Sequence, residues 1–99
     1  MTDDLLRLYQ AEWCPYSRLV RQRLTELGVP FIALQVEAEP EQRTEMREAT
    51  GTDTIPVAVL PGGRVLSGDA EEIVRALDRH FEEDAEAQRH REKERSHAP

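Results

Sequence analysis

The chain places its only cysteine within residues 13–17, Trp-Cys-Pro-Tyr-Ser, directly after the apolar run Leu-Leu-Arg-Leu-Tyr at residues 5–9. This run predicts a short buried strand over residues 5–10. Apolar residues then recur at helical spacing and predict a helix that ends at residues 28–30, Gly-Val-Pro. These apolar residues are Tyr16, Val20, Leu24 and Leu27. Cys14 therefore stands where a strand gives way to a helix, and a lone thiol there is a candidate nucleophile.

The following segments predict an α/β layer. Residues 31–36 read as a second strand, and so compact a strand–helix–strand connection favours a parallel pair with a right-handed crossover. Pro40 suits the first position of a second helix, short and weakly apolar, that ends at Gly51. Residues 57–60 and 64–66, joined by Pro-Gly-Gly, predict a hairpin. The second half of the sheet should therefore be antiparallel, and the sheet mixed.

The last predicted helix begins with a capped turn at Asp69 and closes the core. Its inward stripe consists of Ile73, Val74, Leu77 and Phe81. Residues 82–99 contain three apolar residues, all alanine, so we expect a charged tail that is a frayed helix or disordered. The folded domain is accordingly placed at residues 1–81. We expect exposed side chains at the three histidines, whose spacing fits no metal site with Cys14; they are His80, His90 and His97.

Composition fits one soluble, cytoplasmic domain. The 99 residues are 38% hydrophobic, enough for one modest core. No apolar run is long enough to cross a membrane, and residues 1–4 are acidic where a signal peptide would be basic. The net charge of −7 argues against binding to nucleic acid or to an anionic membrane surface. A single cysteine excludes a disulfide framework or a multi-thiolate metal site within one chain, while a site shared by two chains stays open.

The position of Cys14 before the first helical turn favours the thiolate, because free backbone N–H groups and the positive end of the helix dipole lie there. Pro15 at the helix start removes no useful donor. Arg18 and Arg21, one and two turns into the helix, either add to the positive potential or form a solvated helix face. The alternative for Cys14 is an inert, buried thiol that acts as a small hydrophobe.

The order of the predicted elements, β-α-β-α-β-β-α, resembles that of a glutaredoxin. Residues 13–17 at the first turn and residues 54–56, Thr-Ile-Pro, before the third strand match the pattern of that family. A Gly-Asp pair at residues 68–69 opens the last helix, and the resemblance spans residues 5–81. It implies a thioredoxin-like fold, with a four-stranded mixed sheet flanked by three helices. It also implies a thiol–disulfide oxidoreductase whose catalytic residue is Cys14.

The resemblance further implies a site for glutathione or a related small thiol. Pro56 matches the cis-proline that the family places opposite the cysteine, and an ordinary strand-initiating proline is the alternative. Ile55 would offer its backbone N–H and C=O to a peptide-like ligand in the manner of strand addition. Thr54 completes this Thr-Ile-Pro segment.

The two carboxylate ends of glutathione carry over unevenly. Arg43 stands where the family has an Arg or Gln that holds the glycine carboxylate, whereas Ala11 replaces the lysine of a second anchor. The γ-glutamyl end would lie at Gly68 and Asp69, where free N–H groups bind a carboxylate. Asp69 as a plain N-cap is the alternative, and either Asp69 or Glu71 would take the polar role.

Ser17 stands where a dithiol protein carries its second cysteine, which limits the chemistry to one sulfur per chain. The sequence therefore predicts a monothiol oxidoreductase that reduces mixed disulfides between proteins and a small thiol. We expect a monomer whose partners are thiol-modified proteins, with Trp13 covering the site and Tyr16 partly contacting the core.

Two other functions stay open at the level of sequence. One is an iron–sulfur cluster carrier, in which two chains and two glutathione molecules supply the thiolates. Pro15 and Tyr16 argue against it, since cluster-binding members usually have Cys-Gly-Phe-Ser. The other is a thioredoxin-fold binding or redox-sensing module in which Cys14 is only occasionally modified, and Ala11 mildly favours it.

Overall fold

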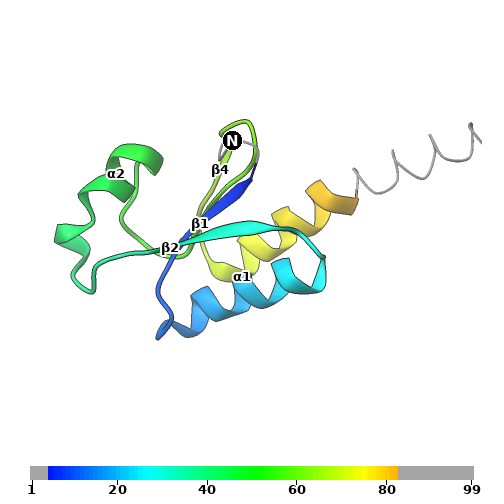
Figure 1. Cartoon of the computed structure of the whole chain (residues 1–99), viewed down its shortest axis with the longest axis horizontal. Helices are drawn as coiled ribbons and strands as arrows, with labels where there is room; N and C mark the ends of the chain where they lie inside the picture. Colours follow the sequence, from blue (N-terminus) through cyan, green and yellow to red (C-terminus); the bar gives the residue numbers. More distant parts are fainter. Residues whose placement is uncertain (1–4, 83–99) are drawn as a thin grey trace, which may run out of the picture.

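The computed structural model describes residues 5–82 and contains one sheet of four strands in the order β2-β1-β3-β4 (Figure 1). The strands are β1 (Leu6–Gln10), β2 (Phe31–Gln35), β3 (Val57–Val59) and β4 (Val65–Leu66). β1 and β2 are parallel, with Leu6 opposite Phe31, whereas β3 is antiparallel to both β1 and β4. The predicted mixed sheet and its hairpin are therefore confirmed.

Two of the predicted helices are present much as expected. α1 (Pro15–Glu26) starts with its proline at the first helical position. The third predicted helix covers residues 70–82, hereafter the 70–82 helix. The backbone C=O of Asp69 accepts the N–H of Ile73 at 3.0 Å, which is the bond expected of an N-cap residue.

The prediction of a single helix between Pro40 and Gly51 is wrong in detail. The segment consists of a short 3-10 helix, η2 (Pro40–Gln42), followed by α2 (Thr44–Thr50). Arg43 separates them with φ −85° and ψ 54°, outside helical geometry. α2 ends at Gly51, whose φ of +82° is the left-handed conformation that glycine adopts without a steric penalty.

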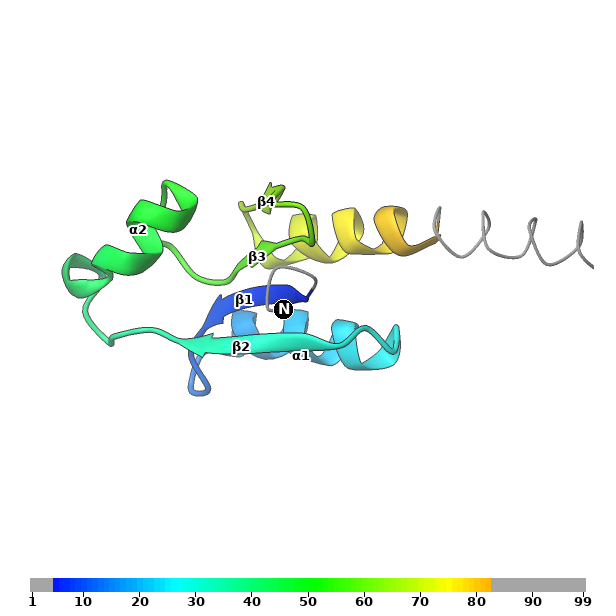
Figure 2. The same ribbon diagram turned by 45° about the horizontal axis from the view of Figure 1, so that its top comes forward.

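Each face of the sheet buries its own core, because successive side chains of a strand point to opposite faces. On one face, Leu6 and Leu8 of β1 pack with residues of α1 and the 70–82 helix. On the other, Tyr9 packs with Met46 of α2. Both views show α2 standing apart from the other two helices (Figure 2). The core residues from α1 and the 70–82 helix are Val20, Leu24, Ala70, Ile73 and Leu77.

The structure tests only part of what the sequence predicts for the end of the chain, because the described residues stop at Glu82. Residues 83–99, with His90 and His97, lie outside the described residues, and Glu82 belongs to the 70–82 helix. The predicted exposure of His80 is wrong: the residue is half-buried, and its ring stands edge-on to Phe81 with centroids 4.8 Å apart. Within residues 5–82, none of the helices has both the length and the apolar character needed to cross a membrane.

Candidate thiol site

The strand pairing brings two segments that are distant in the chain to the same end of the central strands. Tyr9 near the end of β1 lies opposite Val57 at the start of the antiparallel strand β3. The segment that leads from β1 to Cys14 therefore starts at the same end of the sheet at which Pro56 precedes β3. That residues 14 and 56 follow and precede paired strands at the same end of the sheet is a consequence of register, which local sequence patterns alone do not reveal.

Cys14 is the N-cap residue of α1. Its N–H donates to the backbone oxygen of Ala11 at 3.1 Å, and its own carbonyl accepts the N–H of Arg18 at 3.0 Å. The residue is 7% exposed, at the turn that joins β1 to α1. The first hydrogen-bonded turn of α1 thus begins at Cys14. The free N–H groups of that turn therefore point toward the Cys14 sulfur.

Burial by itself would raise the pKa of the Cys14 thiol, but the surrounding donors outweigh it and the pKa is lowered. The strongest of these donors are the backbone N–H and the hydroxyl of Ser17, followed by the N–H of Tyr16 and the charge of Arg21. Ser17 is fully buried, and its oxygen accepts the N–H of Ala11 at 3.3 Å. That bond orients the hydroxyl, so its proton is available to the sulfur.

Of the two arginines weighed from the sequence, only Arg21 acts on the thiol. Its guanidinium donates to the side-chain oxygen of Gln10 and to the carbonyl of Ala11 at 3.3 Å, and pairs with Glu12 at 3.2 Å. Arg18 is exposed and is not among the groups that act on Cys14. The buried Gln10, predicted only as part of a strand, therefore holds the charge of Arg21 near Cys14.

Replacing Ser17 with Ala should raise the pKa of Cys14, since the thiolate loses its hydroxyl donor. Alkylation of the thiol, followed against pH, should then be slower at neutral pH and recover at alkaline pH, where the thiolate forms without assistance. Arg18→Gln on the same helix is the matched control and should leave the curve in place. An unshifted curve for Ser17→Ala would contradict the assigned hydrogen bond.

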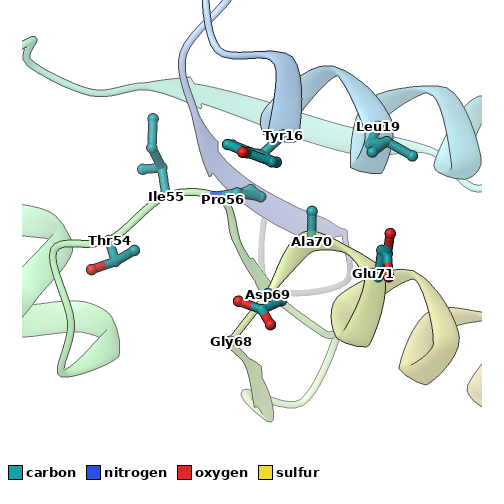
Figure 3. Close-up of a pocket in the computed structure, with 9 residues that line it drawn as sticks. All are labelled: Tyr16, Leu19, Thr54, Ile55, Pro56, Gly68, Asp69, Ala70 and Glu71. Atoms are coloured by element: carbon teal, nitrogen blue, oxygen red, sulfur yellow. The ribbon is translucent and has the colours of Figure 1, made fainter.

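A pocket of about 570 Å³ opens beside this turn (Figure 3). Tyr16 and Leu19 of α1 form one side, and Asp69 and Glu71 lie on the other, with Pro56 between them. The Ile55–Pro56 peptide bond is cis, as the resemblance implied. All the expected ligand contacts except Arg43 line this pocket. The complete lining is Tyr16, Leu19, Thr54, Ile55, Pro56, Gly68, Asp69, Ala70 and Glu71.

The aromatic residues of the motif differ from expectation. Tyr16 is 62% exposed and borders the pocket, so its predicted contact with the core is wrong. The reason is its place on α1, whose buried face begins with the neighbouring Ser17 and continues with Val20. Trp13 is 63% exposed and not part of the lining, so its role as a cover stays a prediction. Leu19, 46% exposed, is a pocket residue that helical spacing gave no reason to select.

The family model for glutaredoxins matches residues 6–65, from the first strand of the sheet to the last. This match covers more than half of the chain and includes both Cys14 and Pro56. The chain belongs to the glutaredoxin family.

Curated relatives agree with this assignment. The glutaredoxin of Pseudomonas aeruginosa is 35% identical over 49 residues, which are 50% of this chain and 58% of that protein. An uncharacterized glutaredoxin-like 8.6 kDa protein of Clostridium pasteurianum, from a rubredoxin operon, is 20% identical over 75 residues. Those residues are 76% of this chain and 100% of the relative.

Solved structures confirm the thioredoxin-like fold. A glutathione transferase homologue from Sulfitobacter, with bound glutathione, has a TM-score of 0.68 at 15% identity over 81% of this chain. A transferase from Methylobacterium radiotolerans, in complex with glutathione sulfonate, has a TM-score of 0.66 at 29% identity over 77%. The chain spans 38% and 35% of those two proteins.

Arg43 has a different place in this glutaredoxin from the one the resemblance implied. The residue is only 5% exposed and is not part of the pocket lining. Its guanidinium donates to the carbonyls of Glu37 at 2.8 Å, Asp53 at 2.8 Å and Ala38 at 3.1 Å. These bonds fold the chain around the break between η2 and α2. We therefore leave Arg43 out of the ligand site.

Gly68 has a φ of +112°, a conformation that residues with a side chain rarely adopt, and a Cβ there would lie 2.9 Å from a carboxylate oxygen of Glu72. Gly68→Ala should therefore lower the free energy of unfolding by about 1–3 kcal/mol, because the backbone is strained even if Glu72 turns away. Denaturant unfolding measures this. Ser67→Ala next to it is the control, and equal stability of the two variants would contradict the assigned conformation.

The described residues offer a thiol ligand a pocket but no metal site. Across residues 5–82, no three His, Cys, Asp or Glu side chains are grouped so that they could hold a metal ion. The arrangement provides a thiol of lowered pKa, a neighbouring pocket and free N–H groups at the start of the 70–82 helix. These are the parts required to exchange a disulfide and hold one of its halves.

Proposed function

We propose that this glutaredoxin is a monothiol oxidoreductase that removes a small thiol, glutathione or a relative, from mixed disulfides with proteins. One observation carries the proposal: the lowered pKa of Cys14 at a helix start whose neighbouring pocket is lined by Pro56 and Ile55. A thiolate is the species that attacks a disulfide. The adjoining pocket offers room for the small-thiol half of the substrate.

The reaction would proceed by two exchanges. The Cys14 thiolate attacks the small-thiol sulfur of the mixed disulfide, forming a new S–S bond while the bond to the protein breaks. The electron pair leaves on the protein sulfur, which takes a proton from water. A second small thiol then attacks the sulfur bound to Cys14, regenerating the thiolate and releasing a symmetric disulfide. The net change converts one mixed disulfide and one free small thiol into one protein thiol and one symmetric small-thiol disulfide.

Ser17 would have a specific part in both steps. As a hydrogen-bond donor to the sulfur it stabilises Cys14 as an attacking thiolate in the first step and as a leaving group in the second. It provides no second sulfur, so within one chain the adduct is resolved only by an external thiol. Because one chain carries both the thiol and the pocket, the proposal needs only a monomer, acting where the small-thiol pool is reduced, as in the cytoplasm.

Mass spectrometry during turnover tests the proposal. The protein is incubated with a glutathionylated protein substrate, with and without free glutathione. Without free glutathione, we expect Cys14 to gain one glutathionyl group while the substrate loses one. With it, the adduct should disappear and the substrate should be reduced catalytically. Failure to form any adduct with glutathione or another small thiol would overturn the proposal.

A further inference from the structure

The pocket beside Cys14 has one acidic wall. Asp69 and Glu71 both contribute to its lining, and none of its lining residues is Lys or Arg. Figure 3 shows both acidic residues across from Tyr16 and Leu19, with the Glu71 side chain reaching toward Leu19. The start of the 70–82 helix offsets this charge only in part, since a helix N-terminus carries about half a positive charge. Two carboxylates leave the wall negative.

No arginine near this region in the chain lines the pocket: Arg18, next to Leu19, is exposed and outside the lining, and the others have contacts elsewhere. Arg43 is bonded to three backbone carbonyls, and Arg21 to Gln10 and the turn before Cys14. Arg75 and Arg79 of the 70–82 helix line a different hollow. The acidic wall therefore has no basic side chain from its own pocket to neutralise it.

The opposite wall is apolar. Its side chains are uncharged and of low polarity, and a wall of this kind concentrates the electric field of the charged groups that face it. A ligand tail in the pocket would contact hydrocarbon on one side and two carboxylates on the other. This wall is formed by Leu19 and the ring of Tyr16, while Ile55 and Pro56 add apolar surface next to it and Ala70 lies on the acidic side.

We propose that this pocket selects small thiols by charge, favouring a tail with a positive amine over a neutral tail, and a neutral tail over one with a carboxylate. The inference rests on the proposed function, because it concerns the thiol that remains attached to Cys14. The substrate class is then mixed disulfides of amine-bearing thiols that carry few carboxylates. Glutathione, with two carboxylates, is a poorer match than a smaller cationic thiol.

Adduct formation on Cys14 isolates the selecting step. The thiolate attacks one sulfur of a symmetric disulfide, a Cys14–S–S–R bond forms, the original S–S bond breaks, and the second half leaves as a thiolate. Three disulfides of similar size differ mainly in tail charge: cystamine, 2-hydroxyethyl disulfide and 3,3′-dithiodipropionate. For each disulfide, the rate of adduct formation on Cys14 is followed by mass spectrometry and divided by the rate at which the same disulfide reacts with a free thiol in solution. This division removes the intrinsic reactivity of each disulfide from the comparison.

We expect the corrected rates to fall in the order cationic, neutral, anionic, with a change of roughly 2–5-fold for each step, as exposed charge pairs produce. Salt should compress the order. The double variant Asp69→Asn, Glu71→Gln should flatten it, whereas the double variant Glu41→Gln, Glu48→Gln changes the net charge equally at exposed positions outside the pocket lining and should preserve it.

The outcomes separate this inference from the function on which it rests. Equal corrected rates for the three disulfides, or an order that survives the pocket variant unchanged, would overturn charge selection even if the protein turns over glutathionylated substrates. A charge order that the pocket variant flattens would support the inference. It would do so even if no catalytic turnover were found, in which case the proposed function alone would fail.

Discussion

Replacing Cys14 with Ser should reduce catalytic turnover of a glutathionylated protein to the uncatalysed rate. The exchange requires a thiolate, and Cys14 is the only thiol of the chain. A serine hydroxyl is not ionised at neutral pH and forms no disulfide. The measurement is the release of the protein thiol over time, together with the mass of the Cys14→Ser variant, which should show no adduct.

Ser17→Ala is the informative comparison for this loss. It keeps the nucleophile and removes a donor that lowers the pKa of Cys14. Its turnover should therefore be slower at neutral pH but restored toward the wild-type rate at alkaline pH, while Cys14→Ser stays inactive throughout. Turnover by Cys14→Ser at the wild-type rate would end the assignment of Cys14 as the catalytic residue.

Arg43→Met should lower the free energy of unfolding by about 2–4 kcal/mol. Methionine retains much of the apolar volume but none of the donors, so the carbonyls of Glu37, Ala38 and Asp53 lose a charged partner. Denaturant unfolding measures the loss. In conditions where the variant is folded, the KM for the small thiol should stay near the wild-type value, because Arg43 does not line the pocket.

Arg47→Met provides a matched control on the neighbouring helix. Arg47 is 39% exposed along its side chain, pairs with Asp53 at 3.1 Å, and makes two exposed hydrogen bonds to the carbonyls of Pro40 and Glu41. An exposed pair of this kind contributes about 0–1 kcal/mol, so the control should lose much less stability than Arg43→Met. The opposite result for Arg43, unchanged stability with a large rise in KM, would restore the glycine-carboxylate role that the sequence suggested.

Much of the fold could be predicted because its signals are local. The apolar run of β1, the proline at the start of α1 and the Pro-Gly-Gly of the hairpin each depend on near neighbours in the chain. The junction that holds Cys14 follows from two of these signals. The family resemblance then identified Pro56 and the start of the 70–82 helix, which line one pocket.

The errors have a common physical origin. Helical spacing assigned Tyr16 to the core, but its side chain, in the first turn of α1, is exposed and borders the pocket. A matching position assigned Arg43 to a ligand, but its side chain is buried against carbonyls. In both cases the direction of one side chain depends on segments distant in the chain, which local patterns do not describe.

The sequence by itself determined the order of the elements, the lone cysteine at the start of a helix and the limit of one thiol per chain, since each depends on residue identity and local spacing. Only the tertiary structure decided that Arg21 acts on Cys14 while Arg18 does not. It also decided that Asp69 and Glu71 line the same pocket as Pro56. The reason is that the strength of a charge's effect depends on distance and burial, and both arise when separate segments pack together.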